Sequence, residues 1–137
     1  APIGGIIRKR VHSPGRFLVA SRAEASVENE QNTVTIEGER DTVIFKQIAG
    51  LVARRIVFNK EVGNHVERGE RVGLIKFGSR VDLFLPLAYS PQVKVGDRVK
   101  GGSSWMARPL ALRPASAADS ISTDSARVQQ LQPMKRS

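Results

Sequence analysis

The sequence contains no cysteine, and this absence removes several classes of function at once. Disulfide bonds, thiolate catalysis and cysteine-ligated metal sites are all excluded. The histidines are His12 and His65 alone, so a zinc site would need carboxylates to complete its set of ligands. We therefore expect a protein without a metal.

Aromatic residues and long apolar runs are also scarce. Aromatics make up 5% of the sequence, whereas a protein that stacks nucleic-acid bases needs exposed aromatic rings. No apolar run approaches the roughly 20 residues that a membrane-spanning helix requires, and no signal peptide is recognisable. The sequence begins with Ala rather than Met, which leads us to expect a processed or incomplete N-terminus.

Positive charge, by contrast, is abundant. The 137 residues, 40% of them hydrophobic, suit one domain with a buried core, and they carry a formal net charge of +9. A charge of this size predicts an anionic partner, either nucleic acid or acidic lipid headgroups. The scarcity of aromatic rings favours lipid over nucleic acid.

Short alternating segments separated by turn signals predict a mainly β protein. The expected strands are residues 4–12, 32–39, 41–50 and 51–58, with a turn at 13–15 and, at 17–31, a loop containing at most one helical turn. The second and third strands should form a β-hairpin, because a single turn around Gly38 separates two alternating runs.

An internal repeat occupies the second half of the sequence. Glu61–Gly73 resembles Lys94–Met106, with valines and glycines matching at positions 33 residues apart: Val62, Gly63, Val66 and Gly69 match Val95, Gly96, Val99 and Gly102. The glycines should take backbone angles that side chains forbid, and the valines should point into the core. Two copies predict pseudo-symmetric halves of a small barrel or sandwich, and the pattern resembles the hammerhead hairpins of biotinyl and lipoyl domains.

The composition changes after Pro109. Residues 110–137 are rich in Ala, Ser, Gln and Pro and have little apolar periodicity, which predicts a mostly disordered C-terminal tail. We therefore expect one folded domain at residues 1–109 and a tail at 110–137.

The segment KFGSRVDLFLP, Lys76–Pro86, places a Gly-Ser pair between an apolar run and an alternating run. One interpretation is a β-hairpin with a type II′ turn, which accepts Gly at its first central position. The other is that the Gly78–Ser79 peptide bond is itself reactive. Attack of the serine hydroxyl on the preceding carbonyl would replace the amide by an ester, and β-elimination and hydrolysis would then leave a pyruvoyl group. The dipeptide alone does not decide between them.

The surrounding residues favour the reactive bond. The longer segment GERVGLIKFGSRVDLFLP, Gly69–Pro86, resembles the processing site of the phosphatidylserine decarboxylases. The resemblance continues in consistent order through SPGRFLVA at 13–20, ENEQNTVTIE at 28–37, KQIAGLVARRIV at 46–57 and VKVGDRVKGG at 93–102. It covers about residues 1–106 and is most similar to the short prokaryotic type of the family.

This resemblance implies an enzyme that converts phosphatidylserine to phosphatidylethanolamine and carbon dioxide. Autocleavage between Gly78 and Ser79 would give a β chain and an α chain from one proenzyme. Ser79 would become a covalently bound pyruvoyl group that forms a Schiff base with the substrate, without metal or pyridoxal phosphate. The implied partner is phosphatidylserine in anionic membranes, at the cytoplasmic side of the cell membrane, with no nucleic acid, and the enzyme is expected to be a peripheral homo-oligomer.

The family also has a catalytic Asp and a His upstream of the residues that match Ala1–Gly5. This sequence contains neither, so we expect an N-terminally incomplete chain that is poorly active by itself.

Other candidate residues have ordinary explanations. Ser103 and Ser104 offer a rival cleavage site, but the repeat places them at a turn and not at a strand junction. His12 could reach the substrate headgroup, although a surface position is favoured, and His65 should be an exposed loop residue. The basic run Arg8–Arg10 should be a solvated face, with lipid contact as the sharper alternative.

Two other classes of function stay open at this stage. A carrier of the biotinyl or lipoyl type needs a modifiable lysine at a hairpin tip, and Lys76 and Lys100 lack the expected Met, Ala or acidic neighbours. A basic β-domain that binds RNA is supported by the charge and opposed by the few aromatic rings. Trp105 and Met106 could anchor at a membrane interface or pack against the domain.

Overall fold

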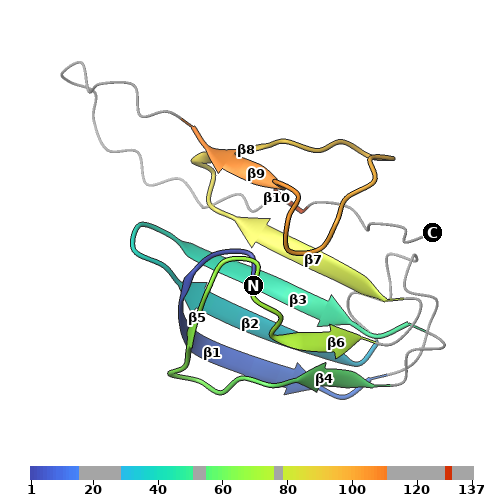
Figure 1. Ribbon diagram of the computed structural model, residues 1–137. Helices are drawn as coiled ribbons and strands as arrows, with labels where there is room; N and C mark the ends of the chain where they lie inside the picture. The colour runs from blue at the N-terminus through green and yellow to red at the C-terminus, as the bar shows by residue number, and fades with distance from the viewer. Residues whose placement is uncertain (16–28, 51–54, 76–78, 111–128, 131–137) are drawn as a thin grey trace, which may run out of the picture.

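The computed structural model describes residues 1–15, 29–50, 55–75, 79–110 and 129–130. Every regular element within these ranges is a strand, which confirms the mainly β class (Figure 1). The strands are β1 (Gly5–Ser13), β2 (Gln31–Glu37), β3 (Thr42–Ile48), β4 (Ile56–Phe58), β5 (His65–Val66), β6 (Gly73–Ile75), β7 (Arg80–Leu85), β8 (Tyr89–Pro91), β9 (Ala107–Pro109) and β10 (Gln129–Gln130). The described residues include no helix long and apolar enough to span a bilayer.

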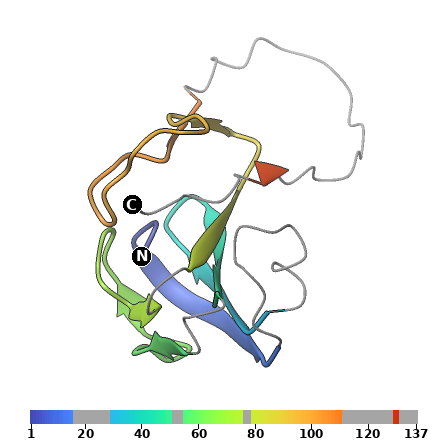
Figure 2. The same cartoon turned by 90° about the vertical axis from the view of Figure 1, so that its right-hand side faces the viewer.

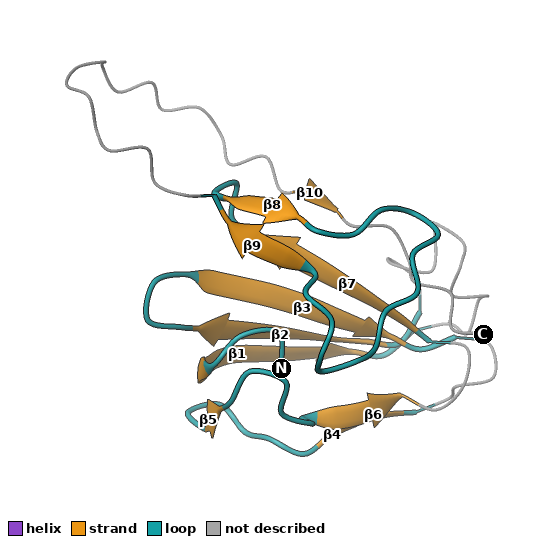
Figure 3. Cartoon of the chain, turned by 45° about the horizontal axis from the view of Figure 1, so that its top comes forward, coloured by secondary structure: helices purple, strands orange, loops and turns teal. Residues whose placement is uncertain are grey.

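One antiparallel sheet organises the molecule. Its strand order is β10-β7-β3-β2-β1-β5, and it curls into half of a barrel (Figures 1 and 2). Two small sheets, β4-β6 and β8-β9, lie beside it (Figure 3). The barrel or sandwich expected from the sequence is therefore present as a half-barrel with two satellite sheets.

The predicted hairpin forms the centre of this sheet. β2 and β3 pair from Glu37 with Thr42 to Gln31 with Ile48, and the Gly38 N–H donates to the Asp41 carbonyl across the turn at 2.9 Å. Alternate residues of both strands are buried, because successive side chains in a strand point to opposite faces. The core contains side chains from both halves of the chain: Ile7, Val34, Ile36, Phe45, Val66 and Val72.

The structure contradicts the interpretation of the segment around Ser79 as a hairpin. β6 pairs with β4 in a satellite sheet, whereas β7 pairs with β3 in the main sheet. The chain therefore leaves one sheet at Ile75 and enters the other at Arg80. A local sequence pattern cannot distinguish the two arrangements, because the partner of a strand is set by contacts between segments far apart in the chain.

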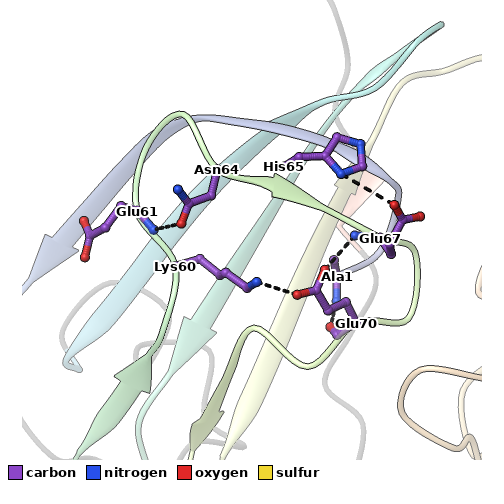
Figure 4. A network of polar contacts seen from close by, with 7 residues as sticks. All are labelled: Ala1, Lys60, Glu61, Asn64, His65, Glu67 and Glu70. Atoms are coloured by element: carbon purple, nitrogen blue, oxygen red, sulfur yellow. Dashed lines mark hydrogen bonds and ion pairs between the residues drawn. The ribbon is translucent and has the colours of Figure 1, made fainter.

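The internal repeat is a repeat of backbone structure. Gly63 and Gly96 have φ values of 93° and 97°, and Gly69 and Gly102 have φ values of 81° and 80°. The first turn of each copy also makes the same bond: the Glu61 N–H donates to Asn64 Oδ1 in one copy, and Lys94 donates to Asp97 in the other, both at 2.9 Å. Figure 4 shows the bond of the first copy.

The two copies meet at their second glycines. A Cβ atom added to Gly69 would lie 2.7 Å from the Gly102 carbonyl oxygen, and one added to Gly102 would lie 3.1 Å from the Gly69 oxygen. The valines at the first turns depart from expectation, because Val62 and Val95 are 56% and 88% exposed. They lie at turn tips beside glycines of positive φ, where the chain reverses away from the core, so the prediction that they point inward is wrong.

The β8-β9 sheet is held to the main sheet by a single described side-chain bond. The Tyr89 hydroxyl donates to Asp41 Oδ2 at 2.7 Å, 48 positions apart in sequence. Burial, with this bond and the Asp41 charge, raises the pKa of Tyr89 above its usual value. The β2-β3 turn therefore carries the attachment point of the β8-β9 sheet.

Most of the loop expected at 17–31 and of the tail expected at 110–137 lies outside the described residues. Gln129 and Gln130 are described, and they pair with β7 opposite Leu85 and Phe84.

Gly69→Ala should destabilise the protein more than Gly63→Ala. Both changes place a side chain at positive φ, which costs about 1–2 kcal/mol. The new methyl group at position 69 also clashes with backbone, whereas nothing lies within 4 Å of the same group at position 63. Urea unfolding should therefore show a loss in the free energy of unfolding of about 3 kcal/mol for Gly69→Ala, where steric crowding adds to the backbone cost, and about half of that for Gly63→Ala. Equal losses would show that the two copies do not press on each other here.

The phenol of Tyr89 should titrate above pH 10, and Asp41→Asn should lower its midpoint by removing a nearby negative charge. A raised pKa in the folded state means that the stabilisation is fully present below the unfolded value and is lost as pH rises through the folded value. Tyr89 is the one tyrosine in the sequence, so the ultraviolet absorbance of phenolate follows this residue alone. If Asp41→Asn left the titration midpoint of Tyr89 unchanged, the result would contradict the hydrogen bond between Tyr89 and Asp41.

Candidate functional site

Ser79 lies at the point where the chain enters the main sheet. It is half-buried and directly precedes β7, while Gly78 and Lys76 fall outside the described residues. The first residue of β7, Arg80, pairs with Ile48 of β3. Continuing this antiparallel register by one residue places Ser79 beside Ala49.

The backbone beside Ser79 is fixed by two bonds. The Asn29 side-chain amide donates to the Ala49 carbonyl at 2.7 Å, and the Ala49 N–H donates to the Glu30 carbonyl at 2.9 Å. Asn29 and Ala49 are both fully buried. Because buried polar groups lose water, breaking either bond would leave a costly unpaired group. This end of β3 is consequently a rigid neighbour for Ser79.

A buried ion pair follows Ser79 immediately. Arg80 donates to both carboxylate oxygens of Asp82, from Nε at 2.5 Å and from a terminal nitrogen at 3.1 Å. The two side chains are 5% and 1% exposed. Residues two apart in a strand share a face, so the pair forms along β7 itself. It fixes the direction of the backbone that carries Ser79.

Further buried polar groups cross the same end of the sheet. The Asn32 amide donates to Gln47 Oε1 at 2.8 Å, and Arg10 Nε donates to Asn32 Oδ1 at 3.1 Å. These bonds join β1, β2 and β3. We call the buried set the polar end of the sheet: Asn29, Asn32, Gln47, Arg80 and Asp82. In the described part of the chain, every buried side-chain nitrogen and oxygen has a hydrogen-bond partner.

His12 does not lie beside Ser79. It is on β1, 48% exposed, with Nε2 3.0 Å from Glu30 Oε1. The strand order β7-β3-β2-β1 puts three strand spacings between the two residues, about 14 Å along the sheet. The surface interpretation of His12 fits this position, and Glu30 is its partner.

The other sequence candidates are exposed. His65 is 63% exposed and lies 3.5 Å from Glu67 (Figure 4). Ser103 and Ser104 are exposed at the second turn of the second repeat copy, where Ser104 Oγ accepts from the Lys100 N–H at 2.9 Å. Neither serine lies where two sheets join.

The basic run has two different environments. Arg8 is exposed and pairs with Glu37 at 2.7 Å, and this bond lowers the pKa of the carboxylate. Arg10 instead turns inward, with its guanidinium 4.9 Å from the centre of the Phe58 ring. Of the basic run that was expected to be solvated, Arg8 is therefore exposed and Arg10 is partly buried. Among the described residues, no group of three or more His, Asp or Glu side chains is arranged to hold a metal ion.

Sequence reasoning missed the polar end. A signal for part of it is present in RVDLFLP, where opposite charges two apart in an apolar strand predict a pair on one face. Asn29, Asn32 and Gln47 carry no such signal. Their burial comes from the pairing of strands that are separate in sequence.

The family model described as phosphatidylserine decarboxylase matches residues 1–107. A protein of Solibacter usitatus named phosphatidylserine decarboxylase proenzyme is 58% identical over 109 residues, which are 80% of this chain and 53% of the relative. Proteins of the same name from Nitrosomonas europaea and Amoebophilus asiaticus are 50% and 44% identical over 72% and 79% of this chain, and 46% and 48% of their own lengths. The chain thus spans about half the length of the curated relatives it matches. No solved structure matches it.

Asp82→Asn should destabilise the protein far more than Glu37→Gln. Removing one partner of a buried ion pair costs about 3–5 kcal/mol, because the other charge stays in a poorly solvated site. The Arg8–Glu37 pair is exposed on both sides, and such pairs contribute about 0–1 kcal/mol. Chemical unfolding of both variants measures the difference. Similar small losses would show that the Arg80–Asp82 pair does not hold β7.

Proposed function

Because the chain belongs to the phosphatidylserine decarboxylase family, we propose that it forms part of an enzyme converting phosphatidylserine to phosphatidylethanolamine and carbon dioxide. The observation that carries the proposal is the family match over residues 1–107. The position of Ser79 between two sheets supports it, since this serine belongs to the segment that resembles the processing site.

We propose that the chain is cleaved between Gly78 and Ser79. The Ser79 hydroxyl attacks the Gly78 carbonyl carbon, and an ester replaces the amide as the freed amine takes a proton. Elimination then breaks the ester bond, giving a carboxylate at Gly78 and a dehydroalanine at position 79. Addition of water and loss of ammonia leave a pyruvoyl group as the new N-terminus. Glycine before the serine leaves the attacked carbonyl open to approach.

The environment of Ser79 suits this reaction. The Arg80–Asp82 pair fixes the strand on its C-terminal side, and the Asn29–Ala49 bond fixes the neighbouring strand. An anchored backbone lets the reacting groups stay aligned, which lowers the entropic part of the barrier. Half-burial of Ser79 also limits the water that would compete with the hydroxyl.

A pyruvoyl group supplies a ketone that accepts the substrate amine and draws the electrons left by the departing carboxylate. The chain's own contribution is to hold position 79 at the start of β7, beside a strand end whose polar groups are already paired. Arg80 and Asp82 neutralise each other, so this buried pair adds little net charge to the strand that carries position 79.

The alternative functions have less support. The exposed tips of the two repeat copies carry Val62–Gly63 and Val95–Gly96, and a carrier of the biotinyl or lipoyl type needs a lysine there. The resemblance to hammerhead hairpins therefore supports a proposal about the fold, and it does not support attachment of biotin or lipoate to a lysine. An RNA-binding role would need several exposed rings, and Trp105 is the one aromatic side chain among the large exposed apolar residues that the structure describes.

We also propose that the protein works at the cytoplasmic face of the cell membrane. A diacyl lipid leaves a bilayer reluctantly, since each buried methylene contributes about 0.8 kcal/mol. The enzyme must therefore reach its substrate at the surface, and a net charge of +9 attracts it to anionic lipid.

Ser79→Ala should abolish cleavage, and Ser103→Ala should not. For this test, the chain replaces the matching 109 residues of the Solibacter usitatus relative in a chimeric protein. Intact mass under denaturing conditions then identifies the products. We expect two fragments that meet between residues 78 and 79, the second lighter by one ammonia than hydrolysis would give. Cleavage at Ser103, or an uncut protein with decarboxylase activity, would rule out this assignment.

The same protein tests the reaction itself. Borohydride with phosphatidylserine present should fix lipid to the fragment that begins at position 79, and the Ser79→Ala variant should give no adduct. Activity that depended on added pyridoxal phosphate or metal would contradict the proposal.

A further inference from the structure

The two repeat copies share a backbone and differ in charge. The first copy, residues 61–73, contains three acidic and two basic residues, whereas the second, residues 94–106, contains three basic residues and one acidic residue. At equivalent positions, Glu61 is replaced by Lys94 and Glu67 by Lys100. Since the turns have the same geometry, folding does not require this reversal of charge. The first copy serves as an internal reference for the second.

The first copy contains an acidic residue whose charge is paired within the protein. Glu70 pairs with Lys60 at 2.5 Å, and this bond lowers the pKa of the carboxylate (Figure 4). Within the described ranges, by contrast, no acidic side chain pairs with Lys94, Arg98 or Lys100, and all three are exposed. The second copy therefore presents unneutralised positive charge to its surroundings.

Trp105 differs even more from its counterpart. The equivalent residue of the first copy, Val72, is a core residue and 7% exposed, whereas Trp105 is 50% exposed. Two guanidinium groups lie over its ring, with Arg68 Cζ 4.8 Å and Arg108 Cζ 4.9 Å from the ring centre. The arginines thus hold the indole in one orientation at the surface through cation–π contacts.

We propose that residues 94–108 form a basic hairpin that docks on the surface of a bilayer containing anionic phospholipid. The inference rests on the proposed function, which places the substrate in a membrane. Trp105 and the 88% exposed Val95 supply apolar groups for the interfacial layer, where indole rings are favoured. Lys94, Arg98 and Lys100 contact lipid phosphates, and each such residue strengthens binding about fivefold.

The attachment of the basic hairpin suits it for docking. The Tyr89 hydroxyl donates a hydrogen bond to Asp41 at the base of the β8-β9 sheet, and Gly102 lies close against Gly69 of the first copy. The hairpin is thus braced at two separate points before it meets a membrane, so little conformational freedom is lost on binding. A nucleic acid fits this surface less well, because the hairpin contains a single aromatic ring on which a base could stack.

Trp105 is the one tryptophan in the sequence, so its fluorescence reports on the basic hairpin alone. The full chain is titrated with vesicles of phosphatidylglycerol and phosphatidylcholine, which contain no phosphatidylserine. We expect a blue shift of the emission and binding that weakens as salt screens the charges. Since neither cleavage nor decarboxylation is measured, failure of the proposed function would not change this readout.

The double variant Lys94→Glu and Lys100→Glu installs the acidic residues of the first copy and should weaken binding at least 25-fold. The control, Lys9→Glu with Arg55→Glu, makes the same change in net charge at exposed positions outside the basic hairpin and should weaken binding by only a few-fold. Circular dichroism of both variants establishes that they remain folded.

The proposal is overturned by any of three results. These are equal weakening in the control, equal binding to vesicles of phosphatidylcholine alone, and tighter binding to a single-stranded RNA than to the anionic vesicles. The first result would show that binding depends on net charge alone. The second would show that the lysines do not recognise anionic lipid, and the third would identify nucleic acid as the partner.

Discussion

The buried pair between Arg80 and Asp82 is the interaction on which the rest of the proposed site depends. Two charges taken out of water are tolerated only with good geometry and full hydrogen bonding, and here the guanidinium meets both carboxylate oxygens. A slip of β7 by one residue would turn both charges to the opposite face of the sheet. The pair therefore ties β7 to one register, and continuing that register by one residue puts Ser79 beside Ala49.

The change of sheet before β7 gives Ser79 its particular setting. In a hairpin, the strands on either side of the serine would pair with each other and the turn would project into solvent. Here β6 and β7 pair with different strands, and the serine that directly precedes β7 is half-buried. A bond at such a junction can break while each strand keeps its partners. The fold is in this way compatible with a cleavage that leaves both products in place.

The repeat shows how one backbone unit can serve two purposes. Positive φ values at matching glycines and the close approach of Gly69 to Gly102 fix the geometry of both copies. Side chains at other positions are then free to diverge. The first copy contributes Val66 and Val72 to the core, whereas the second exposes Trp105 and its lysines. Packing in the core limits the side chains of the first copy, whereas the surroundings of the protein limit those of the second.

The sequence by itself determined the mainly β class, the β2-β3 hairpin and the repeat, because alternation and glycine spacing are local properties of the chain. It also carried the family resemblance that singled out Ser79. Only the tertiary structure decided that β6 and β7 lie in different sheets, that Val62 and Val95 are exposed, and that Arg80 and Asp82 are buried together. The same holds for Trp105, whose arginine partners are Arg68 of the first repeat copy and Arg108 of β9. Strand partners and burial depend on segments that are distant in sequence, and no local pattern records which of them will meet.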